Sequence, residues 1–303
     1  MKPVRLKPRF VERVWGTREL APWFPDSAVK IGEVWFTSDD NVTSEGLTLR
    51  ALMERDGEKL LGTAVRPAFG GRFPILVKFL LTREKLSVQV HPDDAYAEEH
   101  EGSPGKTEMW YVLRAGPEAT IAAGFRKTID QAQLRRAVLD GTVEEHLKWW
   151  PAEAGQTYFI PARTVHAVGA DVVICEIQQN SDITYRLWDY GRPRALHLES
   201  SLAVAELRPH PGPGTPVPFG GGELLASCAY FSTERMDLND PVEWHSDSER
   251  FHLLVATRGS GVLTSGRDEW RMRQGECRLI PARCGAYAID GADLEILRVC
   301  VAA

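Results

Sequence analysis

Three short segments of the sequence carry side chains of the kind that bind a divalent metal ion. Polar and apolar residues alternate in the segment 87–91, so a strand there would place Gln89 and His91 on one face. Glu108 would project from a second short strand, and His166 follows a tight turn between strands. Two imidazole nitrogens and two side-chain oxygens form a donor set that suits Zn²⁺, although Mn²⁺, Co²⁺, Ni²⁺ or Fe²⁺ would also bind it. A lone histidine is more often structural than ligating, so the combination indicates the metal site, one per chain.

These segments lie in a chain dominated by short β-type runs that are bounded by turn residues. Such runs, without alternating helices, are typical of a β-sandwich or barrel. Two stretches, near 47–61 and 129–147, instead indicate small helical insertions; in the second, apolar residues recur at helical spacing. The predicted strands span residues 31–37, 73–81, 86–91, 109–114, 158–160 and 172–178. The expected fold class is therefore mainly β.

A stretch rich in proline and glycine, residues 208–222, divides the chain. Proline removes backbone donors and glycine resists ordering, so we expect neither a helix nor a strand ladder in this stretch. We therefore predict a metal-binding domain over 1–207, a linker over 208–222 and a second domain over 223–303.

The two predicted domains share a turn motif. The segment 155–163 reappears as 275–283, an offset of 275 − 155 = 120 residues, with the same Gly, Ile, Pro, Ala and Arg in both copies. The two halves therefore resemble duplicated barrels. At the same offset His166 corresponds to Ala286, so we expect the metal in the first half alone.

Composition excludes several classes of protein. The 303 residues are 43% hydrophobic and 26% charged, which is ordinary for a globular chain and excludes disorder. A net charge of −6 gives no basic excess for nucleic acid. We expect no signal peptide and no membrane segment, and an odd number of cysteines without metal-site spacing favours a reducing, cytoplasmic environment. The sequence leaves open whether the protein is a monomer or a homodimer. The five cysteines are Cys175, Cys228, Cys277, Cys284 and Cys300.

Four longer segments give the chain a closer resemblance. The segments 73–80, 86–94, 105–111 and 176–192 resemble type I mannose-6-phosphate isomerase in its short bacterial form, and the Leu-Ser-Val-Gln-Val-His-Pro run within the second is the most specific. The resemblance covers nearly the whole chain. It implies two cupin-type jelly-roll β-barrels, the second degenerate, and a zinc ion bound by Gln89, His91, Glu108 and His166.

The same resemblance implies a sugar-phosphate substrate and a set of residues that bind it. Aldose–ketose interconversion through a cis-enediol needs a base, a proton relay, and positive charge near the enediolate. Glu176 and Asp182 are the candidate base and relay, and which of them acts stays open. Arg186 is the expected phosphate anchor, because guanidinium forks match phosphate oxygens. Lys106 would supply positive charge; the residues expected to bind substrate are Ser87, Lys78, Lys106 and Arg186.

Two departures from the family pattern bear on these expectations. Gly105 stands where longer relatives have a histidine, and Val34 and Phe36 flank Trp35 where short relatives have serine and glutamate, which leaves sugar selectivity open. Two alternatives to the mannose 6-phosphate reaction therefore remain. One is an isomerase for a different aldose, and the other is a non-catalytic sugar-binding or regulatory cupin, because fold alone does not fix function.

Overall fold

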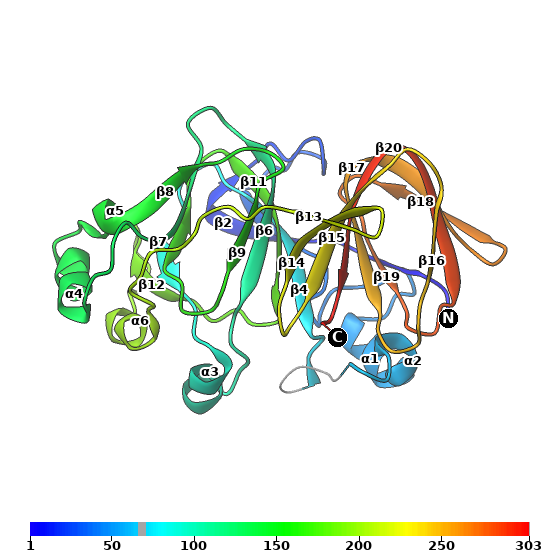
Figure 1. Cartoon of the computed structure of the whole chain (residues 1–303), viewed down its shortest axis with the longest axis horizontal. Coiled ribbons are helices and arrows are strands. Elements are labelled where there is room, and N and C mark those ends of the chain that lie inside the picture. Colours follow the sequence, from blue (N-terminus) through cyan, green and yellow to red (C-terminus); the bar gives the residue numbers. More distant parts are fainter. Residues whose placement is uncertain (66–70, 303) are drawn as a thin grey trace.

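A computed structural model of the chain describes residues 1–65 and 71–302 and is mainly antiparallel β structure. Figure 1 shows two β halves side by side, the first drawn mostly in cyan and green and the second in yellow to red. The described strands form open sheets with edge strands, and none of these sheets closes into a hydrogen-bonded ring. The fold is of the expected mainly β, cupin class.

The first half contains two sheets. The larger runs in the order β2 (Arg9–Thr17), β3 (Ile31–Trp35), β4 (Ile75–Leu81), β11 (Val172–Gln179), β6 (Glu108–Ala115) and β9 (Thr157–Ile160). The smaller runs in the order β12 (Tyr185–Trp188), β5 (Val88–Val90), β10 (His166–Val168), β7 (Thr120–Phe125) and β8 (Leu147–Pro151). Every residue of β4 and β11 is buried, because these central strands are covered on both faces.

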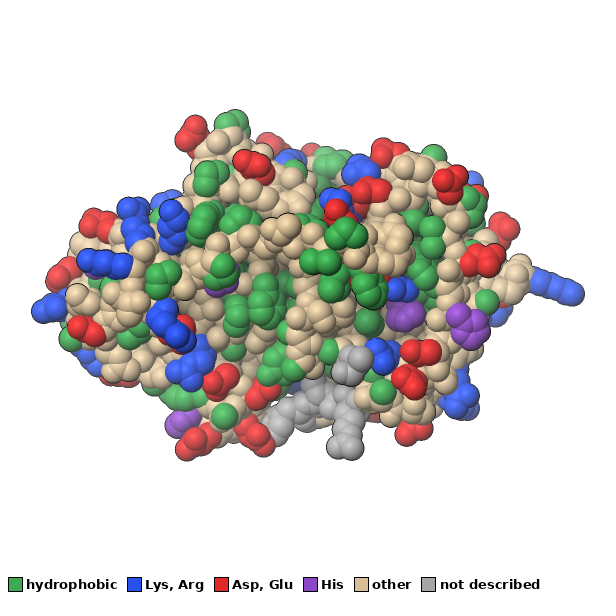
Figure 2. Space-filling model, in the orientation of Figure 1, with side chains coloured by type: hydrophobic (Ala, Val, Ile, Leu, Met, Phe, Trp, Pro, Cys, Tyr) green, Lys and Arg blue, Asp and Glu red, His purple; other side chains and the backbone are tan. Residues whose placement is uncertain are grey.

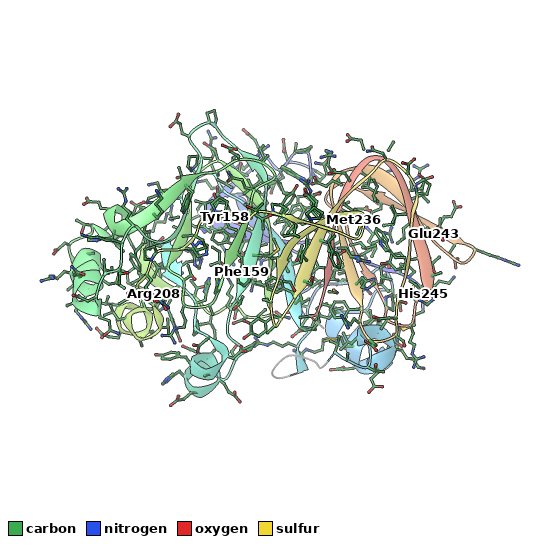
Figure 3. All side chains as sticks on the ribbon, in the orientation of Figure 1. Tyr158, Phe159, Arg208, Met236, Glu243 and His245 are labelled. Atoms are coloured by element: carbon green, nitrogen blue, oxygen red, sulfur yellow. The ribbon has the colours of Figure 1, made fainter. Side chains whose placement is uncertain are left out.

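The second half repeats the order of the larger sheet. Its sheet runs β13 (Val217–Phe219), β14 (Gly222–Ser227), β15 (Ser232–Leu238), β20 (Ala286–Cys300), β17 (His252–Ser265), β19 (Cys277–Ile280) and β1 (Val4–Leu6). Strand β16 (Val242–His245) pairs with the first residues of β20, 286–289. Strand β18 (Asp268–Arg273) pairs with the last residues of β17, 260–265. The motif shared by the two halves thus falls at β9 and β19, which hold the same position in their sheets. In Figure 3, Glu243 and His245 lie on the outer side of this half.

Helices occupy the two predicted insertions and two further places. The stretch 47–61 forms α1 (Leu49–Asp56), capped by Thr48, and α2 (Glu58–Leu61). The stretch 129–147 forms α4 (Gln131–Leu139), with an Asp130–Gln133 capping box, and α5 (Val143–His146). The prediction missed α3 (Asp94–Glu101) and α6 (Leu198–Val204). Among the described helices, none is long and apolar enough to cross a membrane.

The two halves share one apolar core. Phe73 packs on Phe251 across the junction with ring centroids 4.7 Å apart, and both side chains are fully buried. Polar contacts join the halves as well, since the Tyr111 hydroxyl donates to Glu295 at 3.0 Å and the Tyr230 hydroxyl to Asp94 at 2.7 Å. Burial of this apolar surface holds the halves together.

The predicted linker needs one correction. The expectation that 208–222 holds no strand is wrong for Val217–Phe219, which pairs with β14. Pro218 is tolerated because this strand lies at the edge of its sheet, where a missing N–H costs no ladder bond. In addition, β1 belongs to the sheet of the second half although it begins the chain. The domain boundaries themselves stay a prediction.

On the face drawn in Figure 2, acidic and basic side chains are intermixed over both halves.

Candidate active site

The four predicted metal ligands come from both sheets of the first half: Gln89, His91 and His166 from β5, the residue after it and β10 of the smaller sheet, and Glu108 from β6 of the larger sheet. Gln89 on β5 lies directly opposite His166, the first residue of β10, while Glu108 begins β6. His91 follows β5 by one residue. The ligand atoms of His91, Glu108 and His166 all lie within 4.8 Å of one another, and all three side chains are buried. The structure therefore brings the predicted set together.

Backbone carbonyls orient both imidazoles toward Glu108. The Nδ1 atom of His91 lies 2.7 Å from the carbonyl oxygen of Ile183, and Nδ1 of His166 lies 2.9 Å from that of Thr164. Because a carbonyl accepts only, each Nδ1 carries the proton, and each Nε2 carries a lone pair that can accept a hydrogen bond or bind a metal ion. These Nε2 atoms lie 3.7 and 3.3 Å from the carboxylate oxygens of Glu108.

Two further observations support a fit between this group and a cation. The Oε1 atom of Glu108 is buried without a hydrogen-bond partner, which is costly for a carboxylate oxygen unless another ligand reaches it. The Nε2 atom of Gln89 lies 3.2 Å from Nε2 of His166, and rotation of the amide would place its oxygen there. Burial, together with the charge of Lys106, lowers the pKa of His91 well below its usual range and that of His166 to about 3. Both imidazoles are therefore in the neutral form that binds metals.

Lys106 joins this group to Glu176, and a second buried lysine, Lys78, contacts Glu176 from the adjacent strand. The Lys106 ammonium donates to Nε2 of His91 at 3.0 Å, to Glu108, and to Glu176 at 3.3 Å. Lys78 lies opposite Glu176 on the adjacent strand, with its ammonium 3.1 Å from the other carboxylate oxygen. Burial would raise the pKa of Glu176, but Lys106 and Lys78 hold it well below its usual range. Glu176 is therefore an ionised carboxylate inside the protein.

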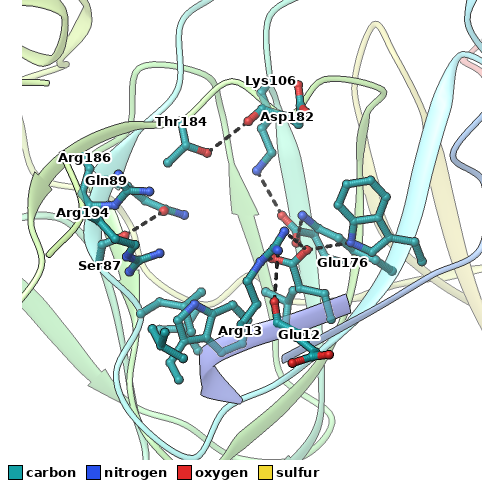
Figure 4. A pocket seen from close by; sticks show the side chains of 18 of the residues that line it. Glu12, Arg13, Ser87, Gln89, Lys106, Glu176, Asp182, Thr184, Arg186 and Arg194 are labelled. Carbon is teal, nitrogen blue, oxygen red and sulfur yellow. Dashed lines mark hydrogen bonds and ion pairs between the residues drawn. The ribbon is translucent and has the colours of Figure 1, made fainter. Parts of the chain in front are cut away.

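These residues open onto a cavity of about 510 Å³. Gln89 and Lys106 line it and also contact the buried His–Glu–His group, so they connect that group with the cavity. Figure 4 shows Ser87, Gln89, Arg186 and Arg194 on one wall and Lys106 and Glu176 on the other. The other predicted residues that line the cavity are Lys78 and Asp182.

Asp182 and Glu176 differ in their surroundings. Asp182 is exposed, whereas Glu176 is almost fully buried between the lysines. Arg186 donates through Nη1 to the carbonyl of Ala195 at 2.8 Å, and its Nε is buried without a hydrogen-bond partner. The cavity therefore has a basic wall at Arg186 and a mixed, charged wall at Glu176.

Several residues that line the cavity were not predicted as site residues, among them Arg13, Glu33, Trp35 and Arg194. Glu33 accepts from Nε and Nη2 of Arg13 at 3.1 and 3.0 Å and from the indole of Trp35 at 2.6 Å. Burial opposes ionisation of Glu33, yet Lys78 and Arg13 lower its pKa. The side-chain alternation of a strand would have predicted part of this group, because it places Glu33 and Trp35 on the same face of β3.

The departures noted in the sequence now have a structural place. Val34 and Phe36 point into the fully buried apolar core, away from the cavity. A Cβ atom added at Gly105 would lie 2.6 Å from the backbone of Asp93 and Asp94, so this close approach requires glycine. Gly105 also donates its N–H to the Asp94 carboxylate at 2.8 Å.

The second half does not repeat the metal-binding group. Where Gln89 faces His166 across β5 and β10, the corresponding pair across β16 and β20 is His245 and Ala286. Within the described residues, His91, Glu108 and His166 form the only group of three or more His, Cys, Asp or Glu side chains whose ligand atoms lie close enough to hold one metal ion.

Comparisons with known proteins agree with this description. Residues 4–124 match the family model "Phosphomannose isomerase type I, catalytic domain", and residues 222–301 match "Mannose-6-phosphate isomerase, cupin domain". The mannose-6-phosphate isomerase ManA of Bacillus subtilis is 34% identical over 310 residues, covering 96% of each chain. The mannose-6-phosphate isomerase of Streptococcus mutans is 33% identical, covering 98% of this chain and 97% of its own.

Solved structures show the same similarity. The crystal structure of the mannose 6-phosphate isomerase from Bacillus subtilis superposes with a TM-score of 0.89 at 30% identity, covering 99% of each chain. A mutant phosphomannose isomerase from Salmonella typhimurium gives a TM-score of 0.84 at 17% identity, which shows the shared fold alone. With near-complete coverage above 30% identity, this chain belongs to the type I mannose-6-phosphate isomerase family.

Proposed function

We propose that this protein interconverts mannose 6-phosphate and fructose 6-phosphate, with a zinc ion bound by Gln89, His91, Glu108 and His166. The observation that carries the proposal is the buried His–Glu–His group that connects, through Gln89 and Lys106, with a cavity whose lining combines lysines and arginines with carboxylates. The relatives named for this activity match over nearly their whole length. Five free cysteines fit a reducing compartment, and we infer a cytoplasmic enzyme.

The donor set supports zinc. Two neutral imidazoles, a carboxylate and an amide oxygen are ligands that this ion accepts, and the Nδ1 contacts to backbone carbonyls fix the imidazoles for binding. When bound, the ion would act as a Lewis acid that polarises the oxygens of the sugar near C1 and C2. Lys106, which lines the cavity and contacts His91, then marks where the reacting end of the sugar would lie.

Isomerisation moves a proton between C1 and C2 through a cis-enediol, and the residues around Glu176 suit that transfer. Glu176 is ionised and so can accept a proton, and its two lysine partners hold its carboxylate in one place. Lys106 supplies positive charge in a buried setting, where it stabilises a developing enediolate more strongly than it would in water. We assign the base to Glu176, and the exposed Asp182 to proton relay at the cavity rim.

The opposite wall suits the phosphate of the substrate. Arg186 lines this wall, its Nη1 is bound to the carbonyl of Ala195, and the rest of its guanidinium group could donate to a phosphate oxygen. Ser87 lies beside it and donates to Gln89 at 3.2 Å, so its hydroxyl is held at the same wall. With phosphate at Arg186 and Ser87, the sugar would extend across the cavity toward Lys106 and Glu176.

One experiment tests the proposal directly. The purified protein is assayed for conversion of fructose 6-phosphate to mannose 6-phosphate with a coupled enzyme readout, while bound metal is quantified by mass spectrometry. We expect about one divalent ion per chain, loss of turnover after chelation, and recovery on adding Zn²⁺. Full activity in metal-free protein would contradict the metal site, and the absence of turnover with metal bound would favour a non-catalytic sugar-binding protein.

A further inference from the structure

We propose that Asp189 is a positioning residue that fixes the arginines of the basic wall and thereby sets the affinity of the cavity for phosphorylated sugars. The inference rests on the proposed function, because it concerns how the same cavity holds its substrate. Asp189 does not line the cavity, and its side chain is only 2% exposed. It acts through Arg194 and Arg186, which do line the cavity.

A single carboxylate collects the guanidinium groups of three arginines. Arg194 donates to Asp189 through Nε and Nη2, both at 2.6 Å, in the two-pronged geometry that guanidinium and carboxylate favour. Arg192 donates through Nη1 at 3.2 Å, and Nε of Arg186 lies 4.0 Å from the same carboxylate. Arg192 also pairs with Glu84 at 3.3 Å and does not line the cavity, so the positive charge available to an anion there is that of Arg194 and Arg186, which share the Asp189 carboxylate.

The turn that carries Asp189 is itself held in place. The N–H of Arg192 donates to the carbonyl of Asp189 at 3.0 Å, and Tyr190 and Gly191 both have positive φ angles, of 56° and 77°. This is the pattern of a type I′ turn. The Tyr190 hydroxyl donates to Glu144 of α5 at 3.1 Å, and Arg192 also donates to the carbonyl of Lys85 at 2.8 Å. The carboxylate therefore has a fixed position relative to the cavity wall.

Loss of the Asp189 charge would leave the arginines without their shared partner. Arg194 and Arg186 are close enough that burial and the Arg194 charge together lower the pKa of Arg186. Without the carboxylate, repulsion would turn these side chains away from each other and toward solvent. The phosphate would then lose its prearranged donors, while Lys106 and Glu176 on the other wall keep their contacts.

Asp189→Asn is the test, because it preserves the shape of the side chain and removes its charge. We expect KM for mannose 6-phosphate to rise by about 10- to 100-fold while kcat falls by less than about threefold, since the phosphate contributes mainly uniform binding. Metal content should be unchanged. Asp171→Asn is the matched control, because it breaks an exposed ion pair with Arg83 outside the cavity. The control should keep both KM and kcat.

A second variant keeps the proposal falsifiable if Asp189→Asn does not fold. Asp189→Glu retains the charge but moves it by one methylene, and we expect a smaller rise in KM with kcat retained. A folded Asp189→Asn protein with KM within twofold of wild type would overturn the proposal, whether or not its kcat falls. If Asp189→Asn is unfolded, an unchanged KM in Asp189→Glu overturns it. Wild-type protein without isomerase activity would instead refute the proposed function, so the two failures are distinguishable.

Discussion

Replacing Glu176 with glutamine removes the proposed base and half of a buried ion pair in one step. Glutamine keeps the shape of the side chain but cannot accept the proton, so kcat should fall by about 10²- to 10⁴-fold, the usual contribution of a general base. Stability should fall as well, because Lys78 and Lys106 lie 3.1 and 3.3 Å from this carboxylate. Breaking a buried pair by removing one partner costs about 3–5 kcal/mol. Lys106 keeps its contact with Glu108, so we expect a loss near the lower end, about 3 kcal/mol.

The second half offers a matched control for this variant. Glu234 and Arg298 form an ion pair across β15 and β20, the strands that correspond to β4 and β11 with Lys78 and Glu176; Glu234 is buried and Arg298 is partly buried. Glu234→Gln should therefore also lower stability, by less than Glu176→Gln, without changing kcat. Both variants are measured by thermal unfolding, where about 3 kcal/mol corresponds to a shift of about 5 °C for a chain of this length. They are also compared in the isomerase assay with metal quantified. A Glu176→Gln protein that binds metal and retains kcat within threefold would refute the base assignment, and so would equal losses of kcat in both variants.

Three further predictions follow from the described contacts. Arg186→Ala should raise KM for mannose 6-phosphate at least tenfold while changing the slow turnover of unphosphorylated mannose much less; equal effects on both sugars, measured side by side, would rule out a phosphate anchor. Gly105→His should lower the melting temperature, because the new Cβ would lie 2.6 Å from the backbone of Asp93. Such overpacking typically costs about 1–3 kcal/mol of stability. An unchanged thermal unfolding curve would contradict this packing. Burial raises the pKa of Cys175 and Cys277 above the usual thiol value, so less thiolate is present at any given pH. Both thiols should therefore resist alkylation by iodoacetamide at pH 8 in the native enzyme. Rapid labelling of the native protein, measured by mass spectrometry, would contradict their burial.

Local alternation explains most of what the sequence alone could predict. The pattern around Gln89 predicted a strand that presents Ser87, Gln89 and His91 on one face; β5 spans only Val88–Val90, but Ser87 and Gln89 do line the cavity together. The repeat of the segment 155–163 at 275–283 indicated a duplication, and the two sheets have the same strand order. Both features depend on residues that lie close together in the chain, where side-chain period 2 and turn chemistry act directly.

What the sequence missed depends on pairing between distant segments. Arg13 reaches the cavity only because β2 pairs with β3, which places it beside Glu33, and no spacing within either strand shows that contact. Arg194 depends on a turn whose positive φ angles fold it back onto Asp189. Helix α3 had a local signal that was overlooked, since Asp93 caps its first turn and Gly102 ends it in the left-handed region.

The placement of β1 has a consequence for anyone who wishes to divide this chain. The first residues complete the far sheet by covering the edge of β19, and the Phe73–Phe251 contact continues that apolar seam. A fragment ending near residue 207 would carry β1 without its partner strand and would expose the apolar surface around Phe73. The remaining fragment would have an unpaired edge at β19, and such an edge is prone to aggregation. The second half, which lacks the His–Glu–His group, thus supports the packing of the half that contains it, and this is a structural reason for the chain to keep both halves.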